Sequence, residues 1–414
     1  MTITDEDYRY LSEHVYWLDP KHPKYNPTYK EGVLKLIGKT TFKILKIQEN
    51  SKTDGMQAMA VAPIRNGVVD QSSIVIVYAG TNTADINDIM TDLITIGGLF
   101  DKTASPGFSI DRSPQRLDGQ ATSSLQFAHK VKQSYSEAQI TTTGHSLGAY
   151  LALLVATENQ WRSVSFNGPD PYEILTSKAK KWAKKHRSWL KNYRHRGDLL
   201  GNFMGDRTGA EIKVNLEMEL SLFAQAYHSL ASWKFDAKGR LVIPKNDFNQ
   251  KALVKQEEYY LNKSFETELA TLHKTREKLK KINDGNLSTN ARLYLDSQQA
   301  SLVLHQVKSI HQLALTKIVN IYQTAISETE LDWKKMLRLA KYQTNQLSDA
   351  EIKEYLAIGG ATRQKLVLEP ARFYQEKINQ AKKIDQRFER LAQELNKKIA
   401  EILQRDRELA QLLK

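Results

Sequence analysis

Hydrophobic residues follow two different periodicities along the chain, and the pattern changes near residue 245. Before that point, runs rich in β-branched and aromatic residues, which are typical of strands, alternate with segments of helical spacing. The predicted strands cover residues 40–47, 56–64, 72–80, 140–143, 162–168 and 191–198, and the predicted helices cover residues 123–134 and a segment after residue 146. This alternation predicts an α/β fold with a mostly parallel sheet and flanking helices.

Beyond residue 250 the strand patterns end, and long apolar stripes with the three-to-four-residue spacing of helices begin. A capping box at residues 348–351 begins a short helix, and Pro370 precedes a long terminal helix. The terminal stripe has the spacing of a coiled-coil seam and consists of Ile384, Phe388, Leu391, Leu395, Ile399, Ile402 and Leu409. We therefore predict two domains, an α/β domain over residues 1–245 and a long-helix bundle or stalk over residues 246–414.

Composition limits the kinds of partner and site. The chain has no cysteine, which excludes structural disulfides and thiolate metal sites. Its formal net charge of +13 favours polyanionic partners, above all an anionic membrane surface, with a lysine-rich solubilising surface as the alternative. We do not expect nucleic acid as a partner, because Lys and Arg are mixed with Glu and Asp along the terminal helix and no recognition motif accompanies them.

The N-terminal segment bears on localisation. It is acidic and amphipathic, whereas a cleavable signal peptide is basic and then apolar. Apolar runs such as the one at residues 150–156 are far too short to span a membrane. We therefore expect secretion by a route that needs no cleavable signal peptide, with a cytoplasmic location as the alternative.

One segment, ITTTGHSLGAYLALLVA at residues 140–156, carries a motif with direct chemical meaning. It predicts a strand that turns directly into an apolar helix, with Gly144, His145, Ser146 and Gly148 at the turn. Glycines on both sides of a serine form the G-x-S-x-G pattern of a nucleophile elbow. Because a serine hydroxyl is a weak nucleophile at neutral pH, it needs a histidine base, a carboxylate that orients the histidine, and donors for the oxyanion.

The position of the base follows from chain order. In the α/β-hydrolase arrangement the acid and then the base follow the serine, on loops after later strands. Three histidines, His186, His195 and His228, lie between the elbow and the helical domain. His186 belongs to a lysine-rich helical segment and His195 to a predicted strand. We therefore predict that His228, the last of the three, is the base.

Two carboxylates compete for the role of the acid. Asp198 directly follows a predicted strand, where a triad carboxylate is expected. Asp170 follows the preceding predicted strand and stands between two prolines, so its simpler role is in a turn. We predict Asp198 as the acid and keep Asp170 as the alternative.

The oxyanion hole requires two donors. One is the backbone N–H of the residue after the nucleophile, here Leu147. The other comes from a loop after an earlier strand, where Gly80 permits a sharp turn and Thr81 offers both an N–H and a hydroxyl. We predict Thr81 and Leu147 as the donors, and this chemistry needs no metal ion and no organic cofactor.

Taken together, these stretches resemble the class 3 lipases, the fungal-type triacylglycerol lipases and their bacterial relatives. GHSLGA is similar to the elbow of that family, VYAGTN followed by TDL to its oxyanion strand, and SFNGPDP to its strand ending in F-G-x-P. The resemblance covers about residues 40–230. Ala79 stands where the family usually has arginine, which weakens the match of the oxyanion loop, and the segment between acid and base is short. Residues 95–110 suit a mobile lid or, alternatively, a surface loop.

The resemblance implies roles for the candidate residues. Ser146 would be the nucleophile, with Asp198 as the acid and His228 as the base. Thr81 and Leu147 would hold the oxyanion. The implied activity is that of a serine lipase or esterase, and the positive charge favours anionic phospholipids as substrates. We predict a phospholipase A-type enzyme that cleaves the sn-1 chain. The alternatives are a hydrolase of small esters or neutral lipids and a catalytically inactive module that binds lipid or a partner.

The domain order also resembles that of lipase toxins that Gram-positive bacteria export by the type VII route, with an N-terminal enzyme and a C-terminal, LXG-like helical domain. The order of the parts, the N-terminal composition, the lack of cysteine and the long helices carry this resemblance, without a diagnostic short motif. It implies an antibacterial role, helical chaperone or targeting proteins as partners, and an immunity protein. In the simpler alternative, the apolar stripes of the helical domain pack only on one another.

Overall fold

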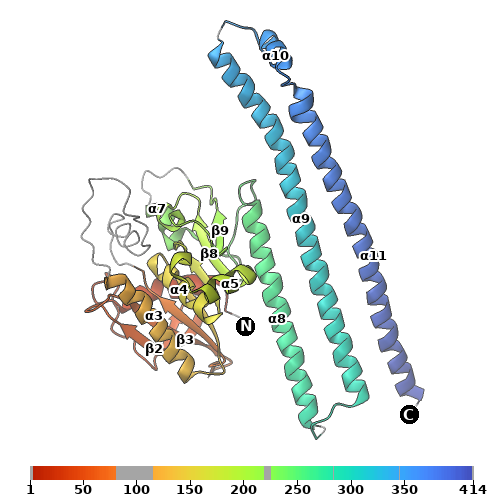
Figure 1. Cartoon of the computed structure of the whole chain (residues 1–414). Helices are drawn as coiled ribbons and strands as arrows, with labels where there is room; N and C mark the ends of the chain where they lie inside the picture. The colour runs from red at the N-terminus through yellow and green to blue at the C-terminus, as the bar shows by residue number, and fades with distance from the viewer. Residues whose placement is uncertain (1–2, 81–114, 219–224, 283, 345, 413–414) are drawn as a thin grey trace. The chain divides into compact units, whose positions relative to one another are not determined.

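The computed structural model describes residues 3–80, 115–218, 225–282, 284–344 and 346–412 (Figure 1). The chain divides into two compact units, Met1–Lys255 and Gln256–Lys414. The division lies within helix α8 (Gln250–Ile282), later than the boundary after residue 245 that the sequence suggests. In the first turns of α8, which belong to the first unit, Ala252 and Val254 are buried, and the Lys255 ammonium donates to the carbonyl of Glu211 on β9 at 2.7 Å.

In the described part of the first unit, nine strands form one sheet in the order β1-β2-β3-β5-β6-β7-β8-β9, with β4 paired to β3. The strands are β1 (Leu34–Ile37), β2 (Thr40–Glu49), β3 (Gln57–Arg65), β4 (Val68–Val69), β5 (Ser73–Tyr78), β6 (Gln139–Gly144), β7 (Arg162–Phe166), β8 (Leu190–His195) and β9 (Glu211–Val214). Strands β5 to β9 run parallel, and β1 to β5 pair antiparallel. The α/β fold class predicted from the sequence is confirmed.

Helices cover both faces of this sheet. The helical segments are α1 (Asp5–His14), η1 (Val15–Leu18), α3 (Gln115–Ser134), α4 (Leu147–Asn159), η2 (Tyr172–Ile174), α5 (Ser177–Lys185), η3 (Arg187–Trp189), α6 (Leu199–Asn202), α7 (Gln225–His228) and η4 (Leu230–Ser232). Successive side chains of a strand point to opposite faces, and β6 shows this directly. Thr142 donates to a carbonyl of α4, whereas Thr141 and Thr143 contact hydroxyls of α1. Helices α1 and α4 therefore lie on opposite faces.

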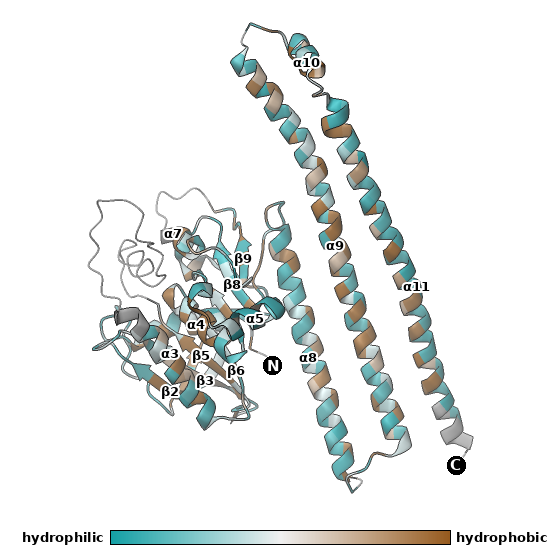
Figure 2. Ribbon diagram, viewed as in Figure 1, coloured by the Kyte–Doolittle hydropathy of each residue, from teal (hydrophilic) through white to brown (hydrophobic). Residues whose placement is uncertain are grey.

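The apolar core of the first unit surrounds β5 and α4. Every residue from Ile74 to Tyr78 is fully buried, and so is every residue of α4 from Leu147 to Thr157. Figure 2 shows hydrophobic residues concentrated in β3 and β5. Because both elements have apolar side chains on all sides, the core fixes the end of β5 and the start of α4.

A buried ion pair attaches helix α1 to the far strands of the sheet. The Lys191 ammonium on β8 lies 2.7 and 2.9 Å from the two carboxylate oxygens of Asp5. The Tyr193 hydroxyl donates to the same carboxylate at 2.5 Å. Asp5 and Lys191 are each 1% exposed. Charges this deeply buried are stable only when they are paired and hydrogen-bonded, so each group holds the other in place.

The described part of the second unit is α-helical. It contains most of α8, then α9 (Thr289–Gln343), α10 (Asp349–Ile358), a π-helix (Gln364–Leu368) and α11 (Glu369–Leu412). Long helices α9 and α11 run alongside each other (Figure 1), joined by an ion pair between Lys308 and Glu389 at 2.8 Å. His311 stacks on Phe388 with ring centroids 4.1 Å apart. Among the described residues, no helix is long and apolar enough to cross a bilayer.

The buried ion pair gives a direct test of the fold. Lys191→Met would leave the Asp5 carboxylate buried without its cation, and we expect the free energy of unfolding to fall by about 3–5 kcal/mol. Urea denaturation followed by circular dichroism measures this loss. Lys24→Met, which removes an exposed pair with Glu13, serves as the control and should cost less than about 1 kcal/mol. Equal losses in the two variants would contradict the role assigned to the pair.

Candidate active site

The predicted elbow is a strained turn between β6 and α4. Ser146 stands between the end of β6 and the start of α4, with φ 58° and ψ −128°. Residues other than glycine rarely adopt a positive φ, and such a backbone costs about 1–3 kcal/mol unless its surroundings hold it. Here the Ser146 amide donates to the carbonyl of Phe166 on β7 at 3.1 Å. The neighbouring strand therefore helps to hold the serine in this conformation.

The two glycines of the motif allow α4 to lie close to the sheet. A Cβ atom at Gly144 would overlap the carbonyl of Gly148, and one at Gly148 would overlap the carbonyl oxygen of Tyr78 at the end of β5. A larger residue at either position would force the helix away from the strands. The spacing of the motif therefore has a packing cause, in addition to the positive φ of the serine.

Asp198 and His228 lie together in a buried pair. Nδ1 of His228 is 3.0 Å from each carboxylate oxygen of Asp198. Asp198 also accepts the backbone amides of Leu200 and Gly201, each at 3.1 Å, as the N-cap of α6. Because a carboxylate accepts hydrogen bonds, Nδ1 carries the ring proton and Nε2 is left as the acceptor. This is the geometry of a carboxylate that orients an imidazole base.

Two buried atoms at the site have no hydrogen-bond partner among the described residues, Oγ of Ser146 and Nε2 of His228. Nearly all buried polar atoms in proteins are paired, so unpaired ones call for a functional explanation. A serine–histidine hydrogen bond at a catalytic site is often long before substrate binds. The two atoms that a nucleophile and its base would use are thus among the buried atoms left unpaired.

Asp170, the alternative acid, is engaged elsewhere. Its Oδ2 accepts both the amide and the hydroxyl of Thr208, at 2.9 and 2.8 Å, and its Oδ1 accepts the amide of Tyr172 at 2.8 Å. Burial raises the pKa of the Asp170 carboxyl, although these donors oppose the effect. In the described residues, the structure brings Asp198 to His228 and leaves Asp170 in a loop.

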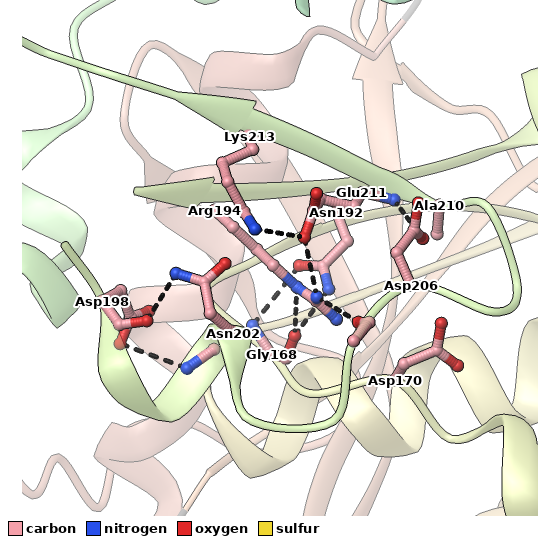
Figure 3. Close-up of polar contacts among 12 residues, drawn as sticks. Gly168, Asp170, Asn192, Arg194, Asp198, Asn202, Asp206, Ala210, Glu211 and Lys213 are labelled. Atoms are coloured by element: carbon pink, nitrogen blue, oxygen red, sulfur yellow. Dashed lines mark hydrogen bonds and ion pairs between the residues drawn. The ribbon is translucent and has the colours of Figure 1, made fainter. Parts of the chain in front are cut away.

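A buried arginine organises this side of the sheet (Figure 3). Nε of Arg194, on β8, donates to the carbonyl of Gly168 at 2.8 Å, and Nη1 donates to the carbonyl of Gly205 at 2.5 Å. Nη1 also pairs with Glu211 on β9 at 3.1 Å. Asn192 donates to the same Gly168 carbonyl at 2.7 Å. The loops that follow β7 and precede β9 are therefore tied to β8, the strand that leads to the acid.

The other two histidines have different surroundings. His186 stacks on Trp182 with ring centroids 4.9 Å apart, and its Nδ1 lies 2.9 Å from the Trp182 carbonyl. His195 stacks on Tyr227 at 4.6 Å, and its Nδ1 accepts the amide of Gly197 at 2.9 Å. No described hydrogen bond joins either ring to the elbow serine or to the candidate acids.

The predicted oxyanion donors are described only in part. Leu147 begins α4, and the first amides of a helix have no partner within the helix. Thr81 and the lid predicted at residues 95–110 lie outside the described residues. Gly80, which directly precedes Thr81, lies against the nucleophile, because a Cβ atom there would stand 3.1 Å from Cβ of Ser146. The described residue that directly precedes Thr81 therefore lies beside the serine.

Sequence reasoning missed two residues of this site. The Tyr16 hydroxyl, in η1, lies 3.0 Å from Nδ1 of His145. Nδ2 of Asn167 donates to the backbone carbonyl of His228 at 2.8 Å. Asn167 has a positive φ of 53°, a conformation that asparagine adopts more readily than most residues, and its place after a strand in SFNGPDP was an available signal. No local pattern marks Tyr16.

Comparison with known families supports part of this picture. Residues 75–169 match the family described as Lipase (class 3), which supports a lipase-type hydrolase family for this segment. The match covers less than a quarter of the chain; it includes the elbow but ends before Asp198 and His228. No curated protein has significant sequence similarity to the chain.

Solved structures show only a distant likeness. The native lipase–propeptide complex of Rhizomucor miehei has 14% sequence identity and a TM-score of 0.32, and the match covers 51% of this chain and 67% of that one. A mutant of MDLA from Penicillium cyclopium has 12% identity and a TM-score of 0.32, with 58% and 82% of the two chains covered. The fold described above therefore rests on strand order and register alone.

The burial of His145, the histidine of the elbow, predicts that the folded state loses stability in acid. Removal of its ring from water, with His228 nearby, lowers the pKa of His145 to about 3, from about 6.5 in an unfolded chain. Between these two values only the unfolded chain binds the proton, so stability is lost as pH falls from 6.5 towards 3. In urea titrations from pH 7.5 to 4.5, His145→Gln should show a shallower loss of stability than the wild type. Parallel curves for the two proteins would contradict this expectation.

Proposed function

We propose that the chain is a serine carboxylic-ester hydrolase with Ser146 as nucleophile, His228 as base and Asp198 as the orienting acid. The observation that carries the proposal is the buried pair of Asp198 and His228. Both carboxylate oxygens of Asp198 contact Nδ1 of His228, and Nε2 of His228 is left unpaired. The strained conformation of Ser146 supports it, because strain of this kind is retained where function requires it.

The proposed reaction is acyl transfer through a covalent intermediate. Nε2 of His228 takes the proton of the Ser146 hydroxyl as Oγ bonds to the ester carbonyl carbon. The backbone amides of Leu147 and Thr81 stabilise the oxyanion that forms. When the ester C–O bond breaks, His228 returns the proton to the leaving alcohol. Water, activated by the same histidine, then releases the fatty acid from the acyl-serine.

We propose anionic phospholipid as the substrate class and a phospholipase A-type cleavage, at the sn-1 position. The formal net charge of +13 supports this choice, since each Lys or Arg near an anionic bilayer surface contributes about 1 kcal/mol of attraction. The match to class 3 lipases supports hydrolysis of acyl esters. Neutral-lipid or small-ester hydrolysis would use the same residues with a different substrate-binding surface.

The proposed biological role is that of an exported antibacterial toxin whose helical unit mediates targeting. It rests on the sequence resemblance to type VII lipase toxins, on the order of the two units and on the chain's composition. Growth inhibition of bacteria that express the wild-type chain, but not Ser146→Ala, would support a toxic lipase. Inhibition by both proteins would instead indicate a toxicity unrelated to ester hydrolysis.

Replacing the nucleophile tests the chemistry. Ser146→Ala should lower the hydrolysis of phosphatidylglycerol vesicles by about 10⁶-fold, or to the detection limit, as is found for nucleophile removal in triad enzymes. Mass spectrometry of the products measures this loss and identifies the acyl chain released. Ser136→Ala, at an exposed turn, is the control and should keep full activity. Retained hydrolysis in Ser146→Ala would refute the proposal, and release of the sn-2 chain would refute the assigned position.

The two candidate acids can be separated by a matched pair of variants. Asp198→Asn should lower kcat by about 10³- to 10⁴-fold, because the amide cannot hold the imidazole in the required tautomer. Asp170→Asn should lower it by less than about tenfold, since Asp170 supports a loop through ordinary hydrogen bonds. Steady-state hydrolysis of a water-soluble ester, with circular dichroism as a check on folding, measures both. A larger loss in Asp170→Asn would exchange the two roles.

A further inference from the structure

A tyrosine from the N-terminal segment reaches the elbow from outside the region that carries the motifs. The Tyr16 hydroxyl lies 3.0 Å from Nδ1 of His145 and 3.3 Å from the His145 carbonyl. Tyr16 belongs to η1, which directly follows α1. Helix α1 is fixed on the sheet through hydroxyl contacts to β6 and the buried ion pair of Asp5 and Lys191. The hydroxyl is therefore presented by an anchored element.

The other ring nitrogen of His145 holds the backbone of the proposed base. Nε2 of His145 lies 2.8 Å from the carbonyl oxygen of His228. A carbonyl only accepts hydrogen bonds, so Nε2 must carry the ring proton, and Nδ1 of a neutral ring must then accept from Tyr16. The same carbonyl also accepts from Asn167 at 2.8 Å, and the His145 and His228 rings lie 4.7 Å apart. The position of the base thus depends on the tautomer of His145.

The Tyr16 hydroxyl also lies beside Gly80, which directly precedes the predicted oxyanion donor Thr81. The Tyr16 oxygen lies against the backbone of Gly80, because a Cβ atom at Gly80 would overlap that oxygen. Burial raises the pKa of Tyr16, so the hydroxyl keeps its proton and can donate it to His145. The Tyr16 side chain therefore contacts both the elbow, at His145, and the end of the segment after β5, at Gly80.

We propose that Tyr16 is a positioning residue for the reaction at Ser146. Through His145 it fixes the backbone of His228, and through its contact with Gly80 it fixes the end of the segment that follows β5. This inference rests on the proposed function, because positioning has meaning only if the serine and the histidine react. It also extends the active site to an N-terminal segment that lies outside the match at residues 75–169.

The charge state of His145 is essential to this arrangement. A protonated ring would have N–H groups on both nitrogens, and the contact with the Tyr16 hydroxyl would reverse its direction. The groups that face the ring are Tyr16, the His228 ring and carbonyl, and the more distant cation of Arg9. Both the burial of the ring and the positive charge of Arg9 favour the neutral form. The network therefore persists in neutral solution, where the His145 ring is uncharged.

A matched pair of tyrosine variants in the N-terminal segment tests the proposal. Tyr8, in α1, also has a buried hydroxyl, which donates to Thr141 at 3.0 Å and contacts neither His145 nor Gly80. Tyr16→Phe and Tyr8→Phe each remove one hydroxyl and the single proton it donates, so both should lower the melting temperature by a similar amount. For p-nitrophenyl butyrate, Tyr16→Phe should lower kcat by about tenfold, the effect of one hydrogen bond, with KM unchanged. Tyr8→Phe should stay within about twofold of the wild type.

A spectroscopic measurement keeps the outcome separate from that of the proposed function. Nitrogen-15 NMR of histidine-labelled protein should show His145 as the neutral Nε2–H tautomer in the wild type and in Tyr8→Phe. In Tyr16→Phe the Nδ1 resonance of His145 should shift as this nitrogen loses its donor, while the His228 carbonyl keeps the ring in the Nε2–H tautomer, and the Gly80 amide resonance should shift. If the wild type hydrolyses no ester, the proposed function fails, and the Nδ1 shift alone decides whether Tyr16 contacts and orients His145. Equal kcat values in the two variants, or an unchanged His145 spectrum, would overturn the inference.

Two substitutions at His145 separate its contact with Tyr16 from its contact with the His228 carbonyl. An amide group in His145→Gln lies near the former Nε2 and keeps a donor for the His228 carbonyl. In His145→Asn it lies near the former Nδ1 and keeps only the contact with Tyr16. We expect His145→Asn to lose more kcat than His145→Gln, by about tenfold. The reverse order would show that the bond to the His228 carbonyl does not position the base, and would overturn that half of the proposal.

Discussion

The site depends on the two-residue turn, His145 and Ser146, by which β6 passes into α4. A chain can make this turn only if one residue takes a positive φ and the helix starts in contact with two strands, and Ser146, Gly144 and Gly148 meet these conditions. The cost of the strained serine is offset by the burial of α4, whose residues from Leu147 to Thr157 are all enclosed. The same packing of α4 against the sheet therefore both builds the core and holds Ser146 in its conformation.

The same unit shows how similar side chains acquire different roles from their surroundings. Asp170 and Asp198 both follow parallel strands and are both buried, yet the first carboxylate closes a loop through Thr208 and the second faces the Nδ1 atom of His228. Backbone amides satisfy part of each group. The two carboxylates differ in their side-chain partner, which is the Thr208 hydroxyl for Asp170 and the His228 imidazole for Asp198.

The sequence predicts those parts of the site that depend on neighbouring residues or on chain order. The elbow is visible because its glycines, serine and apolar helix are contiguous, and the acid and base follow from their order after the strands. Tyr16 is not predictable in this way, since its partner His145 lies 129 positions away and neither residue alone implies the contact. The unit boundary within α8 is hidden for a related reason. The contact of Lys255 with β9 decides that the first turns belong to the first unit, and the helical pattern of the sequence does not change at that point.

The anchoring of α1 has a consequence for the order in which the chain becomes structured during synthesis. Asp5 finds its cation 186 positions later, so the first helix cannot complete its contacts until β8 has left the ribosome. Contacts of such sequence separation are slow to form because loop closure must come first. A nascent chain therefore holds the nucleophile segment before it holds a finished N-terminal support for it. The elbow serine therefore reaches its final surroundings only after most of the first unit has been translated.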